Sequence, residues 1–252
     1  MIPIGLMAWL EPPVQSEVRP CVDRTTMKIL LIDTCGETGS IALADSDSAT
    51  IAASELPSRS ASERLLPVIR DLAATQAVPL PSLGAVVVMH GPGSFTGVRV
   101  GLSAAKGLCE ALQLPLLAIS RLAVLAQSAG AAPAMRIHPV LDAGRGEFYH
   151  GEYLDGVCIG EAMRTREELF AAIGDTTNSL AVVCEQAVAE SLAALRPRVV
   201  APPAAQDAFS IAQRRIGMLA FDDVVTIDAN YLRRTDAEIF AKPTPRATVS
   251  TR

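Results

Sequence analysis

The 252-residue sequence contains few aromatic side chains and no long apolar run. Phe, Trp and Tyr together make up 4% of the chain, so smaller apolar side chains must fill the core, which suits helices packed on sheets. Because no stretch of about 18 apolar residues is present, no membrane-spanning helix is expected. The first residues lack the basic region of a signal peptide. These absences predict a cytoplasmic protein with no membrane partner.

Cysteine pairs and clustered positive charge are missing as well. The five cysteines are scattered without a CxxC spacing, so the sequence signals neither a zinc knuckle nor a disulfide framework. The net charge of −5 argues against a protein that binds nucleic acid by itself, because phosphate contacts need clustered Lys and Arg. A protein that joins a nucleic-acid enzyme as a partner is compatible with this charge.

The common motifs of hydrolytic enzymes are also absent. Neither HExxH nor HxxxH occurs, so no helical pair of metal-binding histidines is indicated. The segment from Gly93 to Gly97 places its serine second instead of third, so it is not a GxSxG nucleophile turn. We therefore expect no catalytic residue and no metal ligand in this chain.

A glycine-rich loop lies between an apolar strand at 85–89 and a helix at 97–112. This order can place backbone N–H groups around an anion at the helix N-terminus. The loop lacks the GK[ST] ending of a phosphate-binding loop and the spacing of a dinucleotide fingerprint, so a sharp turn is the alternative. Its residues are Gly91, Pro92, Gly93, Ser94, Thr96, Gly97 and Arg99. We expect Arg99 to meet a carboxylate or a phosphate, or to form a surface salt bridge.

The helix at 97–112 has a row of small residues at Gly97, Gly101 and Ala105. Residues four apart lie on one face of a helix. Because an interior glycine costs about 1 kcal/mol relative to alanine, a closely approaching neighbour should compensate. That neighbour is either another element of this chain or a helix of a partner protein.

A pattern of strand, aspartate, turn and strand occurs twice. The first unit has Asp33 and Thr34 at the tip of a hairpin that begins at residue 28, and the second has Asp142 after a strand at 137–141. Two such units predict a duplicated α/β architecture. The two aspartates could hold Mg²⁺ and phosphate in a shared cleft, but turn-stabilising Asx hydrogen bonds are the simpler interpretation and the one we favour.

The remaining patterns predict the other elements and the domain limits. Ser60 and Glu63 form a capping box that opens a helix to about residue 76, with a kink or a late start at Pro67. Further strands are expected at 116–119, 147–153 and 180–184, and further helices at 121–127, 166–173, 187–195 and 210–219. The expected division is a disordered extension or misplaced start (1–26), two subdomains (27–132 and 133–235) and a polar tail (236–252).

Five segments resemble the TsaB (YeaZ) family of tRNA threonylcarbamoyladenosine biosynthesis proteins in order and approximate spacing. They are ILLIDTCGETGSIALAD, SERLLPVI, GPGSFTGVRVGLSAAKGL, LDAGRGEFY and ANYLRRTDAE, which together cover about residues 28–240. The resemblance implies the actin/Hsp70-like (ASKHA) fold, with duplicated βββαβα-type subdomains. It departs from the family at Ala61, where many members have histidine, and in LDAGRGEFY, where the arginine is shifted by one position.

The resemblance also implies a function. Proteins of this family are non-catalytic partners of a TsaD-type transferase, which acts on the adenosine beside the anticodon in tRNAs reading ANN codons. They assemble with a TsaE-like ATPase, form homodimers through a similar surface, and meet tRNA through the complex. ATP and metal are expected on the partner subunits, and Asp33, Thr34 and Asp142 are expected to line a vestigial cleft.

The expected partner interface lies on two helices of the first half. Its residues are Glu63, Arg64, Pro67, Val98, Gly101, Ala104 and Ala105. We expect a leucine at Gly101 or Ala105 to block partner binding and leave the fold intact. Two alternatives stay open from the sequence: a stand-alone ATP-dependent enzyme of the same fold, and a glycoprotease-type metallopeptidase.

Overall fold

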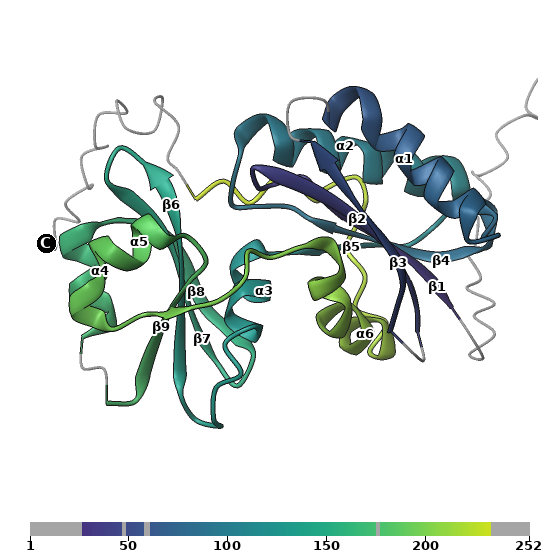
Figure 1. Ribbon diagram of the computed structural model, residues 1–252. Coiled ribbons are helices and arrows are strands. Elements are labelled where there is room, and N and C mark those ends of the chain that lie inside the picture. The colour runs from purple at the N-terminus through teal and green to yellow at the C-terminus, as the bar shows by residue number, and fades with distance from the viewer. Residues whose placement is uncertain (1–26, 47–48, 58–60, 175–176, 233–252) are drawn as a thin grey trace, which may run out of the picture.

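The computed structural model describes residues 27–46, 49–57, 61–174 and 177–232 (Figure 1). The expected extension at 1–26, the polar tail at 236–252 and Ser60 of the capping box lie outside these residues. The elements are β1 (Lys28–Asp33), β2 (Thr38–Asp45), β3 (Ala49–Pro57), α1 (Ala61–Thr75), η2 (Leu80–Ser82), β4 (Leu83–Met89), α2 (Phe95–Leu112), β5 (Leu116–Ile119), α3 (Arg121–Gln127), β6 (Arg136–Gly144), β7 (Glu147–Leu154), β8 (Val157–Thr165), α4 (Arg166–Ile173), β9 (Ser179–Val183), α5 (Gln186–Ser191), η3 (Ala193–Leu195), β10 (Arg198–Val199), η4 (Ala205–Ala208) and α6 (Phe209–Gly217).

Two five-stranded sheets share one topology. The strand order is β3-β2-β1-β4-β5 in the first sheet and β10-β9-β6-β7-β8 in the second. When β1 is matched with β6 and the later strands follow in chain order, every strand has the same neighbours in both sheets. Each sheet starts with antiparallel pairs and then adds strands parallel to its first one. The duplication predicted from the repeated pattern is confirmed.

The first sheet is covered on both faces, as expected for a sheet with parallel central strands. Alternate residues of β1 point to opposite faces, so Leu30 and Ile32 pack with α1 and α2, whereas Ile29 and Leu31 pack with η4 and α6. Figure 1 shows α1 and α2 on one side of this sheet and α6 on the other. The run KILLID therefore has no solvent-facing side.

The two halves of the chain each lend a helix to the other. Helix α3 follows the first sheet in sequence but packs on the second, where Leu122 and Leu125 join Ile137 and Leu141 in one apolar cluster. Helix α6 follows the second sheet but packs on the first through Ala212. The cores therefore do not follow chain order, and the boundary drawn at residues 132 and 133 stays a prediction.

Two local features differ from the expectation. Strand β8 was not predicted, because all nine of its residues are exposed or half-buried, so it lacks the buried alternation that marks a strand. Helix α1 begins at Ala61 and continues through Pro67, so the late start expected at the proline does not occur.

Helix α2 lies unusually close to the tip of the β1–β2 hairpin. The Thr34 hydroxyl donates a hydrogen bond to the Gly97 carbonyl over 2.6 Å. A Cβ atom on Gly97 would lie 2.0 Å from the Thr34 carbonyl oxygen, and one on Gly101 would lie 2.3 Å from Thr34 Oγ1. The small row on α2 is therefore explained by packing within the chain.

The second sheet buries a pair of stacked histidines. The rings of His138 and His150 are 5.3 Å apart and nearly parallel, and a 3.0 Å hydrogen bond joins His138 Nδ1 to His150 Nε2. Arg164 Nε donates to His150 Nδ1, so the proton of His150 must lie on Nε2 and is donated to His138. Burial lowers the pKa of His150 to about 3 and also lowers that of His138, so both rings are neutral near pH 7.

The close approach of α2 predicts opposite effects for the same substitution at two glycines. Gly97→Ala should lower the free energy of unfolding by about 2 kcal/mol, because its Cβ overlaps a backbone oxygen. Gly107→Ala is the matched control in the same helix: its Cβ meets no atom within 4 Å, so the gain in helix propensity should raise stability by ~0.5–1 kcal/mol. Urea unfolding measures both. Equal effects at the two positions would contradict the packing explanation.

The histidine pair predicts a loss of stability in mild acid. The unfolded chain binds protons on histidine below about pH 6.5, whereas the buried rings resist protonation. As the pH falls from about 6.5 toward 5, the free energy of unfolding should fall by up to about 1.4 kcal/mol per pH unit for each histidine. In urea unfolding at several pH values, the double variant His138→Gln/His150→Gln should show a flatter dependence. A wild-type slope in the double variant would contradict the assignment of this pH dependence to the two rings.

Candidate functional site

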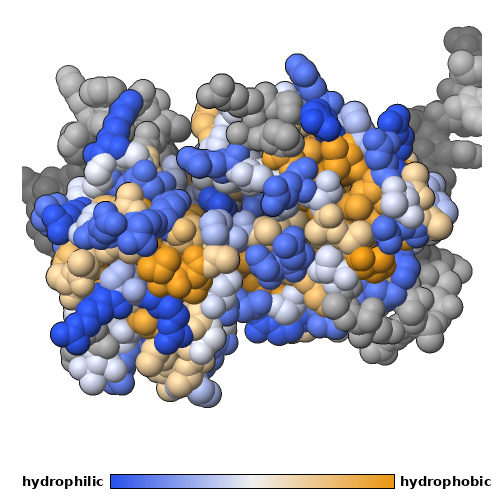
Figure 2. Space-filling view, in the orientation of Figure 1, coloured by the Kyte–Doolittle hydropathy of each residue, from blue (hydrophilic) through white to orange (hydrophobic). Residues whose placement is uncertain are grey.

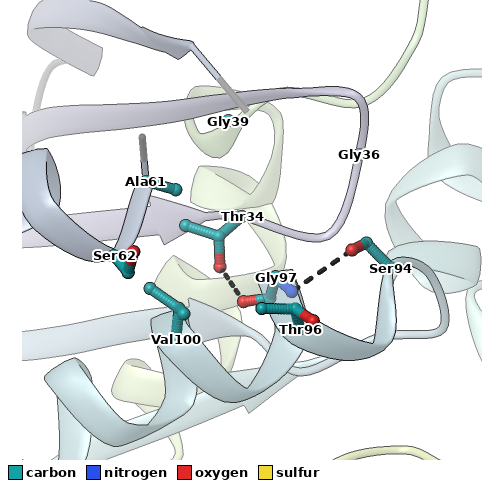
Figure 3. A pocket seen from close by; sticks show the side chains of 9 residues that line it. All are labelled: Thr34, Gly36, Gly39, Ala61, Ser62, Ser94, Thr96, Gly97 and Val100. Atoms are coloured by element: carbon teal, nitrogen blue, oxygen red, sulfur yellow. Dashed lines mark hydrogen bonds between the residues drawn. The ribbon is translucent and has the colours of Figure 1, made fainter. Parts of the chain in front are cut away.

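A pocket of about 260 Å³ opens between the β1–β2 hairpin tip and the N-terminal turns of α1 and α2 (Figure 3). Among the residues that the structure describes, four hydroxyl-bearing side chains and no charged side chain surround it. The lining residues are Thr34, Gly36, Gly39, Ala61, Ser62, Ser94, Thr96, Gly97 and Val100. The pocket therefore brings together loop and helix residues that the sequence places far apart.

Several polar groups at the start of α2 are bonded within the chain itself. The Ser94 side chain caps the helix by accepting a hydrogen bond from the Gly97 amide over 3.2 Å, and the Ser94 amide donates to the Cys35 carbonyl over 2.8 Å. The Thr34 hydroxyl donates its hydrogen bond to the Gly97 carbonyl. With these groups paired and no lysine or arginine among the described lining residues, that part of the pocket offers an anion little beyond the helix terminus.

The glycines of the loop serve close packing. Gly91 has a φ of +109°, a conformation that L side chains rarely adopt. A Cβ atom on Gly91 would also lie 3.3 Å from the Asn230 carbonyl oxygen. A Cβ on Gly93 would lie 2.3 Å from the Cys35 carbonyl oxygen. Pro92 follows Gly91 through a cis peptide bond. Of the two interpretations left open by the sequence, the sharp turn accounts for these residues.

Asp33 is fully buried at the end of β1, and its carboxylate is used locally. Its Oδ1 accepts a hydrogen bond from the Cys35 amide over 2.8 Å, which forms an Asx turn. Burial raises the pKa of Asp33, and the positive charge of Arg121 opposes that rise. The Arg121 guanidinium reaches the hairpin tip, because a Cβ on Gly36 would lie 2.6 Å from its Nη2 atom.

Asp142 makes the corresponding turn in the second half. Its Oδ1 accepts from the Gly144 amide over 2.9 Å, and its own amide donates to Glu185 Oε2 over 3.0 Å. Both aspartates thus make the Asx contacts that we favoured over a shared metal. Among the residues that the structure describes, no three His, Cys, Asp or Glu side chains converge on a possible metal position. The positive charge of Arg121 near Asp33 disfavours a second cation at that carboxyl group.

The expected interface residues divide between surface and core. Glu63, Arg64 and Pro67 are exposed on α1, and Ala104 is half-buried on α2. Three others are buried inside the chain and are unavailable to a partner, which corrects the expectation: Val98, Gly101 and Ala105. Since Ala105 is 0% exposed and Gly101 abuts Thr34, a leucine at either position would disturb the fold.

Exposed apolar side chains mark the outer side of the same helices. Leu66 on α1 is 53% exposed, and Phe95 at the start of α2 is 59% exposed. A shallow groove that contains Phe95, Arg99 and Ser103 runs along α2 beside Ser62 of α1. Figure 2 shows apolar surface interrupting the polar surface over the half of the molecule that carries α1 and α2. Leu66 thus faces solvent, whereas its neighbour Leu65 is buried.

Arg99 meets aromatic rings instead of the expected carboxylate or phosphate. Its guanidinium carbon lies 3.5 Å from the centre of the Phe95 ring, and its Nε donates to the Tyr231 hydroxyl over 2.6 Å. The two rings are 5.8 Å apart. Sequence reasoning missed this cluster because Tyr231 lies far along the chain from Arg99. The i, i+4 spacing of Phe95 and Arg99 was the signal that the sequence offered for their contact.

Comparison with known proteins places these features in a family. The TsaD family profile, described as tRNA N6-adenosine threonylcarbamoyltransferase, matches residues 53–216, well over half of the chain. The chain is 39% identical over 139 residues to the tRNA threonylcarbamoyladenosine biosynthesis protein TsaB of Escherichia coli, covering 54% of this chain and 60% of that protein. It is 36% identical over 127 residues to TsaB of Bacillus subtilis, covering 50% of this chain and 55% of that protein.

A solved structure covers more of the chain. YeaZ from Pseudomonas aeruginosa superimposes with a TM-score of 0.67 at 28% identity, covering 82% of this chain and 100% of that one. The matches to the two curated TsaB proteins, by contrast, span less than two thirds of their lengths. The duplicated sheets and the likeness to YeaZ agree with the predicted ASKHA fold. The chain therefore belongs to the TsaB (YeaZ) family, within the glycoprotease-like superfamily that also contains the TsaD transferases.

Proposed function

We propose that this chain is a non-catalytic subunit in tRNA threonylcarbamoyladenosine biosynthesis, which binds and activates a TsaD-type transferase in the cytoplasm. The observation that carries the proposal is the exposed apolar face of α1 and α2 in a chain of the TsaB family. Relatives of this chain are named for that biosynthesis. The aspartates that would serve a nucleotide are engaged in turns, which favours a partner role over chemistry within this chain.

The partner surface that we propose consists of Glu63, Arg64, Leu66 and Pro67 on α1 and Phe95 on α2, hereafter the α1–α2 face. Leu66 and Phe95 supply large apolar anchors, which tend to dominate binding energy when a partner covers them. Glu63 and Arg64 are exposed beside them and supply a polar rim. This face combines an apolar centre with charged edges, as expected of an interface between proteins.

The other components follow from this assignment. We assign ATP and metal to the partner subunits, a TsaD-like transferase and a TsaE-like ATPase, and tRNA contact to the assembled complex. The net charge of −5 supports tRNA binding through the complex in preference to this chain alone. In the absence of the transferase, a second copy of this chain would cover the α1–α2 face, so homodimer and heterodimer would compete by mass action.

Neither alternative function gains support from a specific observation. A metallopeptidase needs a convergent ligand set, and the described part of the chain offers none. An ATP-dependent enzyme needs accessible carboxylates beside the phosphates, whereas Asp33 is buried and one oxygen of Asp33 and one of Asp142 are bonded in their own turns.

A charge placed on the α1–α2 face should weaken the partner complex. Leu66→Glu should lower the affinity for the organism's own TsaD-type transferase by about tenfold or more, because an exposed leucine anchor is replaced by a carboxylate. Leu219→Glu is the matched control: Leu219 is 67% exposed and follows α6 on the other side of the sheet. Calorimetric titration measures the affinities. If the wild-type chain does not bind, the proposed function is wrong; equal binding by both variants would relocate the surface.

The isolated chain should not bind ATP with Mg²⁺ at micromolar affinity. The reason is that Asp33 is buried with a raised pKa near the positive charge of Arg121, and within the described residues no three His, Cys, Asp or Glu side chains could hold a metal ion. Titration calorimetry of the chain alone, followed by the chain with its transferase partner, separates the two cases. Micromolar binding by the chain alone would favour the stand-alone enzyme.

A further inference from the structure

A carboxylate at the junction of the two halves accepts hydrogen bonds from three separate segments. Glu161 on β8 accepts from Ser120, which caps α3, over 2.5 Å, and from Asn230 over 2.6 Å. It also accepts from the Tyr153 hydroxyl on β7. Within the described part of the chain no ion pair involves Glu161, so its charge is held by neutral donors at a half-buried position.

The segment Asp222–Tyr231, which we call the strap, contains no helix and no strand. It follows α6 and is drawn in yellow in Figure 1, where it leads from the first half to the junction between the two sheets. Val225 is 82% exposed, whereas Val224, Ile227 and Ala229 pack at half-buried positions against the core of the first half. Hydrogen bonds to the elements beneath the strap add to this partial burial and fix its path.

The beginning of the strap is fixed to the edge of the first sheet. Asp222 Oδ2 accepts from the Ala118 amide of β5 over 2.7 Å, and Asp222 Oδ1 accepts from Arg215 of α6 over 3.0 Å. Arg215 also donates to the Ala118 carbonyl over 2.9 Å. These bonds occupy backbone groups of an edge strand that would otherwise be open to pairing.

The rest of the strap lies along α2. Lys106 Nζ donates to the carbonyls of Val225 and Ile227 over 3.2 and 2.8 Å. The backbone amide of Asn230 donates to the His90 carbonyl over 2.8 Å, and the Tyr231 hydroxyl accepts from Arg99 Nε over 2.6 Å. The strap thus touches α2 near its middle and at its first turn, and Asn230 is the residue that also reaches the second half.

We propose that the strap positions the first turn of α2, including Phe95, and that Asn230 links this position to the second half through Glu161. Asn230 has both roles because its backbone binds the loop after β4 while its side chain binds Glu161. Loss of that side-chain bond removes one of three donors to a half-buried carboxylate and frees the end of the strap. Because Tyr231 binds Arg99 and Arg99 stacks on Phe95, movement at the end of the strap then changes the position of Phe95.

The consequence for binding rests on the proposed function, because Phe95 belongs to the α1–α2 face. Glu161, Ser120 and Asn230 are then positioning residues of a partner surface that they do not form. Their effect on affinity arises from the geometry of Phe95 and Arg99, and a change at the junction should be felt at that surface.

The variant Asn230→Asp tests the link directly. It keeps the size of the side chain but places a second carboxylate where the donor to Glu161 stood, 2.6 Å away. The matched control is Asn178→Asp, the same substitution at the chain's other asparagine, which is exposed before β9. Hydrogen–deuterium exchange of the full chain should become about tenfold faster in residues 222–231 and in the first turns of α2 for Asn230→Asp, with no change for Asn178→Asp.

Two outcomes would overturn the proposal. One is an unchanged exchange rate in the strap, and the other is faster exchange in the strap with an unchanged exchange rate in α2. If Asn230→Asp unfolds the whole chain, the variant Tyr231→Phe tests the proposal instead, because it removes the hydrogen bond to Arg99 and keeps the ring. Faster hydrogen exchange in residues 95–99 of that variant supports the proposal, and unchanged exchange overturns it. Affinity for the TsaD-type transferase forms a second measurement, in which Asn230→Asp should bind about tenfold more weakly than Asn178→Asp. Failure of the wild-type chain to bind counts against the proposed function alone, and altered exchange with unaltered affinity overturns the role in partner binding.

Discussion

The contact between Thr34 and the first turns of α2 fixes the geometry of the first half. Because Gly97 and Gly101 present no Cβ, the hairpin tip can rest directly on the helix, and the Thr34 hydroxyl can reach the Gly97 carbonyl. This approach sets where the pocket lies and directs Phe95 outward from the helix start. The two glycines sacrifice helix propensity for this fit, which a burial-driven core can offset.

A second constraint comes from the exchange of helices between the halves. Since α3 completes the core of the second sheet and α6 that of the first, the chain crosses the junction repeatedly. Ser120, Glu161 and Asn230 lie at these crossings and connect three segments through one carboxylate. Among the described residues no cation pairs with Glu161, so hydrogen bonds from neutral donors hold it there, which makes the junction sensitive to small changes. The α1–α2 face and the junction are therefore parts of one arrangement.

The sequence allowed the duplicated fold to be predicted, because Asp33 and Asp142 each follow an apolar strand and precede a turn. It failed where side chains from distant segments meet. The pairing of Arg99 with Tyr231 and of Glu161 with Asn230 depends on the path of the chain after α6, which local patterns do not encode. The small residues Gly101 and Ala105 did not show which neighbour they contact, because close packing within this chain and close packing against another protein both require small side chains. Buried Val98 and exposed Leu66 were likewise decided by tertiary packing.

The exchange of α6 also has a consequence for biosynthesis of the chain. The first sheet contains residues near the start of the described chain, yet one of its faces is completed by Ala205, whose amide donates to Ser40 over 2.8 Å. A ribosome must therefore synthesise the chain past residue 217 before α6 can cover that face. Ile29 and Leu31 would remain exposed until then, and contacts of such large sequence separation form slowly.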